Sequence, residues 1–192
     1  ENFIKNSNVC LILGDNIFYG QNLVKLLEKA KQNKTGATLF AYHVNDPERF
    51  GVINYDNKKN IISIEEKPKR PKSNFAITGL YFYDNTVISK AKSLKPSKRN
   101  ELEITEINNM YLKEKKINVE ILGRGSAWLD TGTFDTLIEA NQFVQIVEKR
   151  QGLKIACLEE IAYNNKWLNK KDLIRKIKSY KNTKYHEYLL NL

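Results

Sequence analysis

A strand, a helix and a second strand follow one another early in the chain, and this order limits the possible folds more than any other feature. Residues 9–13 are a short apolar run that ends at Gly14 and Asp15, which predicts a buried strand followed by a turn. Apolar residues then recur at helical spacing over residues 21–32, and residues 37–44 form a second β-prone run. The sequence therefore predicts a βαβ unit, which favours an α/β fold with a parallel sheet and a right-handed crossover.

Strand and helix patterns continue through residue 150, which predicts one α/β domain over residues 1–150. Further strands are predicted at residues 51–55, 61–65, 75–83 and 117–122. The first two of these flank a polar stretch and are expected to form a hairpin, and Gly79 in the third allows a close backbone approach.

Helices are predicted between and after these strands. One begins near Ile104, and another follows a predicted loop at residues 128–133, where Thr131 or Thr133 can cap it. Strand signals cease after residue 150, and helical patterns follow at residues 158–167 and 169–191. Residues 151–192 are therefore expected to form a small C-terminal helical appendage.

Composition limits the classes of function. The 192 residues are 41% hydrophobic, which is enough for one sizeable core. The net charge is +10, but the lysines are spread along the chain, and no Arg-rich helix, zinc-finger or RNP-type signature is present. A solvated lysine surface is therefore favoured over a nucleic-acid site, and the same charge suits anionic phosphate substrates.

The cysteines and the apolar runs indicate the compartment. Cys10 and Cys157 are far apart in apolar surroundings, which predicts two small core residues in a reducing cytoplasm and no disulfide. No apolar run approaches the roughly 20 residues of a membrane helix, and no signal-peptide pattern opens the chain. The chain begins at Glu1 without methionine and soon reaches a strand pattern, which indicates a fragment.

Two carboxylates stand where a strand is predicted to meet a loop. Asp15 follows a buried strand directly, and Asp130 precedes a Thr-Gly-Thr turn. Mg²⁺ favours one or two carboxylates together with substrate phosphates, so these residues are candidate metal ligands. The alternative, that each is an ordinary turn or cap residue, stays open on spacing alone.

Two basic residues are candidates for binding phosphate. Lys67 ends a predicted strand and Arg99 precedes a helix, so the first can meet a phosphate as a point charge and the second through its planar fork. Taken singly, both also fit a solvated surface. No P-loop, GxGxxG, HExxH or nucleophile-elbow motif is present, and His43 and His186 are the only histidines.

Six stretches of the sequence resemble, in order and spacing, those of glucose-1-phosphate thymidylyltransferases. They read LGDNIFYG (13–20), FAYHVNDPERFGV (40–52), EEKP (65–68), AITGLYFYD (76–84), ELEIT (101–105) and GRGSAWLDTGT (123–133). EEKP alone is shared with other sugar nucleotidyltransferases. A further stretch, KRQGL (149–153), extends the resemblance over nearly the whole chain.

This resemblance implies a fold and a reaction. The fold is a Rossmann-like, glycosyltransferase-A-like nucleotidyltransferase with a mixed sheet flanked by helices. The reaction depends on Mg²⁺: glucose 1-phosphate attacks the α-phosphorus of dTTP, and the products are dTDP-glucose and pyrophosphate. dTDP-glucose is a precursor in dTDP-rhamnose and surface-polysaccharide synthesis. The implied protein is a cytoplasmic homotetramer that binds small-molecule substrates and neither nucleic acid nor membrane.

The resemblance also assigns residues. Asp15 and Asp130 match the family's Mg²⁺ ligands, and Lys67 and Arg99 match residues that hold the sugar phosphate. The residues that match the lining of the sugar site are Phe50, Gly51, Glu66, Ile77 and Tyr81. Phe50 stands where many members carry tyrosine, so a hydroxyl contact is missing there.

One departure from the family is large. The 192 residues contain neither the Gly-Gly-x-Gly-Thr-Arg-Leu loop nor the lysine that grips the triphosphate, so this chain alone is expected to be inactive. Two alternatives are another sugar-phosphate nucleotidyltransferase, of uridylyl or cytidylyl type, and a non-catalytic module that binds sugar phosphates.

Overall fold

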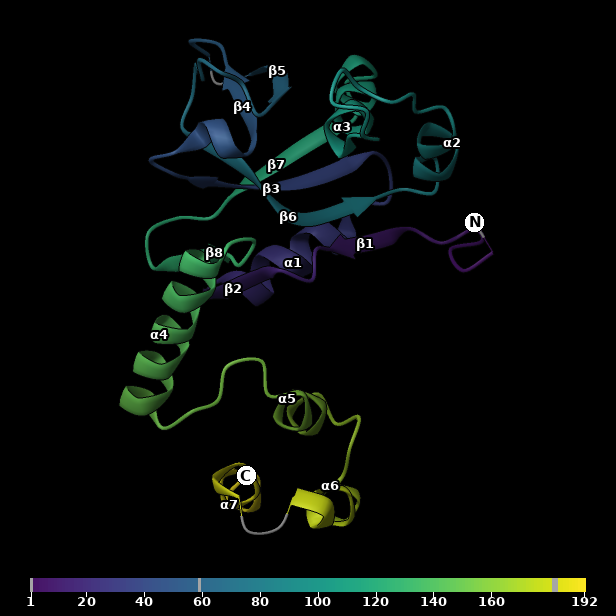
Figure 1. Ribbon diagram of the computed structural model, residues 1–192. Helices are drawn as coiled ribbons and strands as arrows, with labels where there is room; N and C mark the ends of the chain where they lie inside the picture. Colours follow the sequence, from purple (N-terminus) through teal and green to yellow (C-terminus); the bar gives the residue numbers. More distant parts are fainter. Residues whose placement is uncertain (1, 59, 181–182) are drawn as a thin grey trace. The chain divides into compact units, whose positions relative to one another are not determined.

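The computed structural model describes residues 2–58, 60–180 and 183–192. The chain forms two compact units, Glu1–Ala140 and Asn141–Leu192. Figure 1 shows the first unit as a sheet with helices on both faces and the second as a group of helices.

The first unit is built on a mixed sheet. Its strands run in the order β5-β4-β6-β3-β7, and β1 pairs with β6 beside β4. The bounds are β1 Val9–Ile12, β3 Ala37–His43, β4 Gly51–Tyr55, β5 Ile61–Glu66, β6 Phe75–Tyr83 and β7 Ile117–Ile121. The resemblance predicted a mixed sheet flanked by helices, and the structure confirms it.

The prediction of a parallel sheet from the βαβ order was only partly right. Strands β1 and β3 lie on opposite edges of β6 and both run antiparallel to it, so they are parallel to each other but not neighbours. The parallel pairing that does occur joins β3 to β7, with Leu39 opposite Val119. Strand β6 lies between β1 and β3, and its side chains Ala76 and Leu80 pack in the same apolar cluster as Phe40 of β3.

Two apolar layers cover the faces of this sheet. Helix α1 (Leu23–Gln32) covers one face, where Ala30 packs with Phe40 and Leu80. Helices α2 (Val87–Lys92) and α3 (Ile104–Lys113) cover the other, where Ile107 and Tyr111 are buried. Figure 1 shows these helices on opposite sides of β3 and β6.

Strand β1 is not the buried strand that its sequence predicted. Its side chains Leu11 and Ile12 are 40% and 57% exposed, and Leu13 after the strand is 40% exposed. Cys10 is exposed as well, so its predicted place in the core was wrong, whereas Cys157 is buried. Among the described residues β1 pairs with β6 alone, and therefore an apolar run lies on an open sheet edge.

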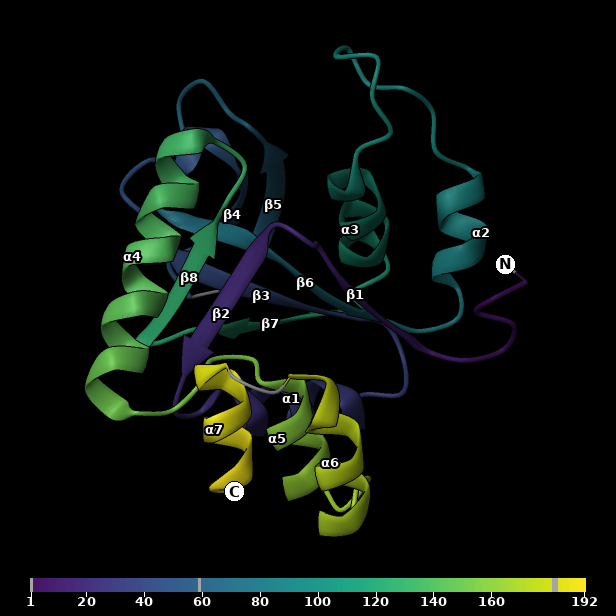
Figure 2. The same ribbon diagram turned by 60° about the horizontal axis from the view of Figure 1, so that its bottom comes forward.

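A separate two-stranded ribbon was missed by the sequence patterns. Strand β2 (Asn16–Gly20) pairs antiparallel with β8 (Ser126–Asp130), so Trp128 and Asp130 belong to a strand and not to the predicted loop. Figure 2 shows the ribbon running beside the main sheet. Helix α4 (Phe134–Gln151) follows, and the Thr133 Oγ1 accepts from the Thr136 amide at 3.2 Å, as a cap does.

The predicted hairpin is confirmed in β4 and β5. Glu66 lies opposite Gly51, and the Asp56 carboxylate accepts from the backbone amides of Lys58 and Asn60 at 2.8 Å each. Lys59, within the predicted turn, lies outside the described residues. A 3₁₀ helix at Pro47–Arg49 leads into β4. Because β4 pairs with β5, the end of β5 lies beside the segment that carries Arg49.

The second unit is helical and begins at Asn141, within α4, whereas the helical appendage was predicted to begin at residue 151. Its elements are α5 (Leu158–Asn164), α6 (Lys170–Ile177), a 3₁₀ helix at Lys178–Tyr180 and α7 (Lys184–Leu190). Leu173, Ile177 and Leu189 form its core together with Cys157. Residues 181–182, in the middle of the predicted 169–191 helix, lie outside the described residues.

Candidate active site

A cleft with a volume of about 590 Å³ lies in the first unit, between the β2–β8 ribbon and the main sheet. The predicted site residues other than Arg99 all line it. The lining residues are Leu13, Asp15, Asn16, Arg49, Phe50, Gly51, Glu66, Lys67, Ile77, Gly79, Tyr81, Ile104, Thr105, Asn108, Trp128, Asp130, Gly132 and Thr133.

The ribbon brings the two aspartates together. Asn16 lies directly opposite Asp130 in the β2–β8 register, so Asp15 and Asp130 stand at the same end of the ribbon. The backbone amide and the hydroxyl of Thr131 both donate to the Asp15 carbonyl, at 2.8 and 2.9 Å. Two acidic side chains that are far apart in sequence therefore meet in one cleft.

The surroundings of Asp130 disfavour its ionised form. Burial in the cleft, and then the negative charge of Asp15, raises the pKa of Asp130 above that of an ordinary aspartate. The positive charges of Arg49 and Lys67 act in the opposite direction without cancelling the rise. The cleft thus holds an acidic pair whose ionised form gains from an added cation.

This acidic pair fits a magnesium-type site better than a zinc-type site. Among residues 2–58, 60–180 and 183–192, no group of three or more His, Cys, Asp or Glu side chains is placed to hold a metal. Zinc in proteins takes three or four such ligands, whereas Mg²⁺ keeps several waters and binds one or two carboxylates with phosphate oxygens. Asp15 and Asp130 supply such a pair.

Lys67 follows β5 directly and lines the same cleft as the acidic pair. Its φ of +41° is unusual for a residue with a Cβ, and the residue precedes Pro68. Its amide donates to the carbonyl of Phe50 at 3.0 Å, which fixes this turn. A backbone held in a rarely populated conformation beside a cleft is a common mark of a functional position.

Glu66 anchors the other wall of the cleft. Its Oε2 accepts a short hydrogen bond from the Thr105 hydroxyl. A Cβ at Gly51 would lie 3.3 Å from Thr105 Oγ1 and 3.4 Å from Glu66 Oε2, so glycine leaves this wall open. Tyr81 and Ile77 are buried beneath it, and burial, with the charge of Glu66, raises the pKa of Tyr81, so its hydroxyl stays neutral.

Arg99 does not line the cleft. Its guanidinium lies 2.9 Å from Glu101, 3.6 Å from Glu103 and 3.6 Å from Glu66. It reaches the site only through Glu66, and its predicted contact with a phosphate stays a prediction.

Three further residues in the cleft escaped the sequence patterns. Arg49 forms an ion pair with Asp130 at 3.5 Å and lies over the Phe50 ring, with 5.2 Å from its Cζ to the ring centroid. The Trp128 indole donates to the Asn16 side chain at 2.6 Å. The signal that was present is position: Arg49 and Asn16 are adjacent to Phe50 and Asp15, and Trp128 stands two residues before Asp130.

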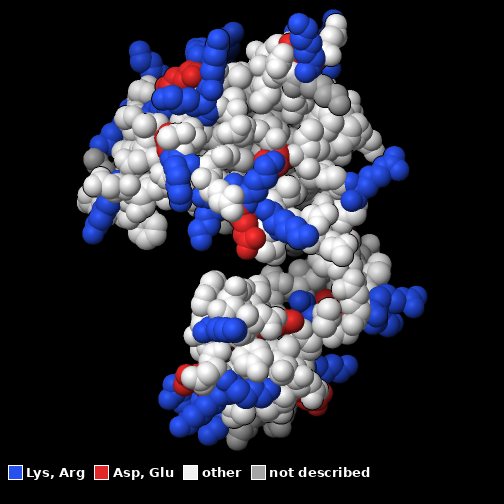
Figure 3. Space-filling model, turned by 180° about the vertical axis from the view of Figure 1, so that it is seen from behind, with Lys and Arg blue, Asp and Glu red and all other residues white. Residues whose placement is uncertain are grey.

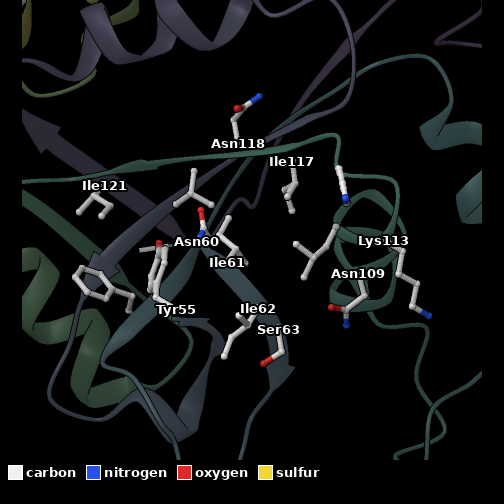
Figure 4. Close-up of a pocket in the computed structure, with 14 residues that line it drawn as sticks. Tyr55, Asn60, Ile61, Ile62, Ser63, Asn109, Lys113, Ile117, Asn118 and Ile121 are labelled. Atoms are coloured by element: carbon white, nitrogen blue, oxygen red, sulfur yellow. The ribbon is translucent and has the colours of Figure 1, made fainter. Parts of the chain in front are cut away.

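A larger groove, of about 1160 Å³, lies elsewhere in the same unit between the β4–β5 hairpin, α3 and β7. Figure 4 shows Tyr55, Ile61 and Ile117 among the side chains that project into it. None of the described residues that line it is acidic, and its basic residues are Lys113 and Lys115. Size alone favours this groove, but the chemistry of a metal and phosphate site favours the smaller cleft.

Basic side chains are spread over the face of the molecule that Figure 3 shows. Figure 3 shows lysine and arginine side chains scattered over the visible face of both units rather than gathered in one patch. This distribution agrees with the predicted solvated lysine surface. No helix within the described part of the chain is long and apolar enough to cross a membrane.

Comparison with known proteins gives consistent results. The family model described as "Nucleotidyl transferase" matches residues 1–146. The chain is 57% identical to a glucose-1-phosphate thymidylyltransferase of Neisseria gonorrhoeae over all 192 residues, which are 67% of that protein. It is 47% identical to the Xanthomonas campestris enzyme of the same name over its whole length, or 65% of that protein. The chain therefore spans about two thirds of the length of these relatives.

Solved structures show the same fold. A Bacillus anthracis protein described as a glucose-1-phosphate thymidylyltransferase, in complex with sucrose, is 46% identical with a TM-score of 0.66; the match covers 74% of this chain and 56% of that one. A UDP-glucose pyrophosphorylase complexed with UDP-glucose gives a TM-score of 0.64 at 24% identity, over 75% of this chain and 59% of that one. At that identity the second likeness concerns the fold alone.

Proposed function

Because the chain belongs to the glucose-1-phosphate thymidylyltransferase family of nucleotidyl transferases, we propose that it forms the metal and sugar-phosphate side of an enzyme that makes dTDP-glucose. The substrates of this enzyme are dTTP and glucose 1-phosphate. The observation that carries the proposal is the meeting of Asp15, Asp130 and Lys67 in one cleft, although they come from three separate parts of the sequence.

The reaction needs little covalent help from the protein. A phosphate oxygen of glucose 1-phosphate attacks the α-phosphorus of dTTP, a new P–O bond forms, and the bond to the β-phosphate breaks as pyrophosphate leaves. The attacking oxygen is already an anion, so no general base is required. Catalysis then rests on in-line positioning and on neutralising charge. The absence of histidine from the lining of the described cleft suits such a reaction.

Asp15 and Asp130 would hold the Mg²⁺ ion. A bound Mg²⁺ supplies charge stabilisation to the phosphoryl group that is transferred. The two aspartates bring their negative charges to one end of the ribbon, and this supports the assignment because their mutual repulsion falls when a cation binds. Arg49, paired with Asp130, keeps part of that charge balanced.

Lys67 is proposed to bind the phosphate of glucose 1-phosphate. Lys67 lines the cleft directly after β5, and its positive charge acts on Asp130. Arg99 is proposed to add a second positive charge from the rim, once it exchanges one of its three carboxylate partners for a phosphate. A charge-assisted contact from each residue would orient the attacking oxygen.

The sugar is proposed to lie against the wall formed by Gly51, Glu66, Ile77 and Tyr81. Glu66 lines the cleft with its Oε2 held by Thr105 and its Oε1 3.6 Å from Arg99, and a carboxylate has further acceptor capacity for sugar hydroxyls. Phe50 packs on the Trp128 ring, with centroids 5.0 Å apart, and supplies an apolar surface without a hydroxyl. This arrangement supports recognition of a neutral hexose attached to a phosphate.

The remaining expectations rest on the resemblance. We propose a homotetrameric, cytoplasmic enzyme whose product feeds dTDP-rhamnose and polysaccharide synthesis. The thymidylyl type is favoured over the uridylyl and cytidylyl types because the relatives that are 40–57% identical carry that name.

The test is turnover of the full-length protein with glucose 1-phosphate and, separately, dTTP, UTP and CTP, followed by pyrophosphate release. The expected result is Mg²⁺-dependent synthesis with dTTP preferred. Asp15→Asn is expected to lower turnover about a hundredfold or more while the protein stays folded, because the charge stabilisation of a metal is worth several kcal/mol. Preference for another nucleotide would reassign the substrate, and unchanged turnover of Asp15→Asn at limiting Mg²⁺ would remove this residue as a ligand.

A further inference from the structure

Asn16 connects the acidic pair to the interior of the first unit. Its side-chain amide donates from Nδ2 to Asp15 Oδ1 at 2.8 Å. Its Oδ1 accepts two hydrogen bonds, from the Trp128 indole at 2.6 Å and from the Gly79 backbone amide at 3.0 Å. Three partners from three different segments therefore hold one amide group.

These partners fix which way the amide faces. Trp128 Nε1 and the Gly79 amide are both pure donors, so the atom between them has to be the oxygen of Asn16. The NH₂ group then has to face Asp15 and can only donate to its carboxylate. A rotation of the Asn16 amide by half a turn would place its NH₂ group against two other donors, the Trp128 indole and the Gly79 amide. It would also place the amide oxygen of Asn16 beside the Asp15 carboxylate, where no hydrogen bond can form.

Gly79 forms the other side of the same contact. A Cβ built at this position would lie 2.7 Å from Cγ and Oδ1 of Asn16, and 2.9 Å from its Nδ2. Carbon atoms do not approach that closely, so any residue larger than glycine would displace the Asn16 side chain. The Gly79 carbonyl also accepts from the Leu13 amide at 2.8 Å, which leaves the backbone of β6 little freedom to move away.

The Trp128 ring is itself held in place. It is only 8% exposed, and it packs against Phe50 and, edge-on, against Tyr42, with centroids 6.2 Å apart. The donor that fixes Asn16 therefore sits on a rigid support, whereas Asp15 itself is exposed at the start of the ribbon. An exposed carboxylate without such a partner would sample several rotamers.

We propose that Asn16 is a positioning residue that orients the Asp15 carboxylate for a divalent cation, and that Gly79 is required because it leaves the Asn16 amide its place. The inference rests on the proposed function in treating Asp15 as a metal ligand. Partners of metal ligands commonly change metal affinity by about 10–100-fold when removed, since they set the orientation of the ligand.

The test measures binding of Mn²⁺ alone to the full-length protein by electron paramagnetic resonance, with Mg²⁺ as competitor. Asn16→Ala and Gly79→Ala are each expected to weaken Mn²⁺ binding by about tenfold. The double variant is expected to bind no more weakly than Asn16→Ala, because alanine at position 79 acts only by displacing the amide that this variant has already lost.

Two control variants match these changes in chemistry. Asn74→Ala removes an amide that donates to the Val44 carbonyl outside the cleft, and Gly123→Ala adds a Cβ where nothing lies within 4 Å. Both are expected to bind Mn²⁺ as the wild type does. Far-UV circular dichroism of all variants separates a change at the site from a loss of fold.

Each outcome decides the matter. Wild-type affinity in folded Asn16→Ala, additive losses in the double variant, or a wild type that binds Mn²⁺ no better than Asp15→Asn would each overturn the proposal. Synthesis of dTDP-glucose by the same wild-type preparation is scored separately. A protein that makes no dTDP-glucose refutes the proposed function, whereas one that does so with an unaltered Asn16→Ala site refutes only this inference.

Discussion

Arg49 places its guanidinium 3.5 Å from the Asp130 carboxylate, in a cleft where burial and a second aspartate already disfavour the ionised form. The same guanidinium donates to Asp46 at 2.8 Å. Arg49 therefore acts as a fixed partial counter-charge for Asp130, held in place from outside the cleft.

Removal of this counter-charge is expected to change the pH dependence of metal binding. Arg49→Met keeps packing against Phe50 but loses the charge that lowers the pKa of Asp130, so that pKa rises further. Since a protonated carboxylate does not bind a cation, the loss of Mn²⁺ affinity on acidification begins at a higher pH in the variant. Mn²⁺ titrations at several pH values measure this, and an unmoved acid limb would show that Arg49 does not influence the site.

Asp130→Asn is expected to stabilise the metal-free protein at neutral pH. The pKa of Asp130 in the folded state is raised above its ordinary value of 3.8, so ionisation disfavours folding as pH rises through the folded value. Asparagine removes that cost, and the apparent melting temperature rises by on the order of 2 °C. The difference is expected to vanish below the ordinary pKa, where aspartate is protonated in both states; calorimetry at pH 7 and pH 3 checks it.

Lys67→Ala is expected to raise the KM for glucose 1-phosphate far more than the KM for dTTP. A charge-assisted contact with a phosphate is worth roughly 1.5–3 kcal/mol, which corresponds to about ten- to a hundredfold. Lys69→Ala is the matched control, because Lys69 is an exposed lysine two residues away that does not line the cleft. Equal effects on both substrates would count against a role in binding the sugar phosphate.

The 192-residue chain alone is expected to make no dTDP-glucose, because it contains no Gly-rich segment to hold the triphosphate. It is also expected to self-associate through β1, an open edge on which Ile12 is 57% exposed. Ile12→Lys should reduce this association without a change in helix content. Light scattering and a coupled pyrophosphate assay test the two parts, and robust turnover by this chain would show that the nucleotide site was misplaced.

The sequence predicted the elements that have a strong local period and missed those that depend on distant partners. The hairpin of β4 and β5 and the helices α1, α3 and α4 were predicted because their turns, caps and apolar spacing lie within one segment. Strand β2 is polar and aromatic without alternation, and it is a strand only because β8, more than 100 residues later, supplies its hydrogen bonds. Strand β1 was predicted to be buried because its residues are apolar. An apolar run does not show whether both edges of the strand are paired, or whether other elements cover its side chains.

The same distinction applies to the cleft. Asp15 and Lys67 were singled out by type and by position at the ends of predicted strands, Asp130 by type and by its place in a predicted loop, and the resemblance gave all three their roles. Arg49 and Asn16 are ordinary residues by type. Folding brings Arg49 beside Asp130, and it brings Asn16, which already follows Asp15 in sequence, into contact with Trp128 and Gly79. Arg99 illustrates the reverse case, since its place outside the lining depends on three nearby glutamates whose conformation no sequence pattern specifies.

The β2–β8 ribbon ties together distant parts of the chain, since Thr131 donates to Asp15 across 116 residues of sequence. A two-stranded ribbon is only marginally stable by itself, so its amides are expected to exchange with deuterium by local opening long before those of β3 and β6. A cation shared by Asp15 and Asp130 binds only the closed ribbon and therefore slows that exchange. The occupancy of the metal site would then set how long the ribbon stays closed, and with it how long the cleft stays formed, as well as the charge of the cleft.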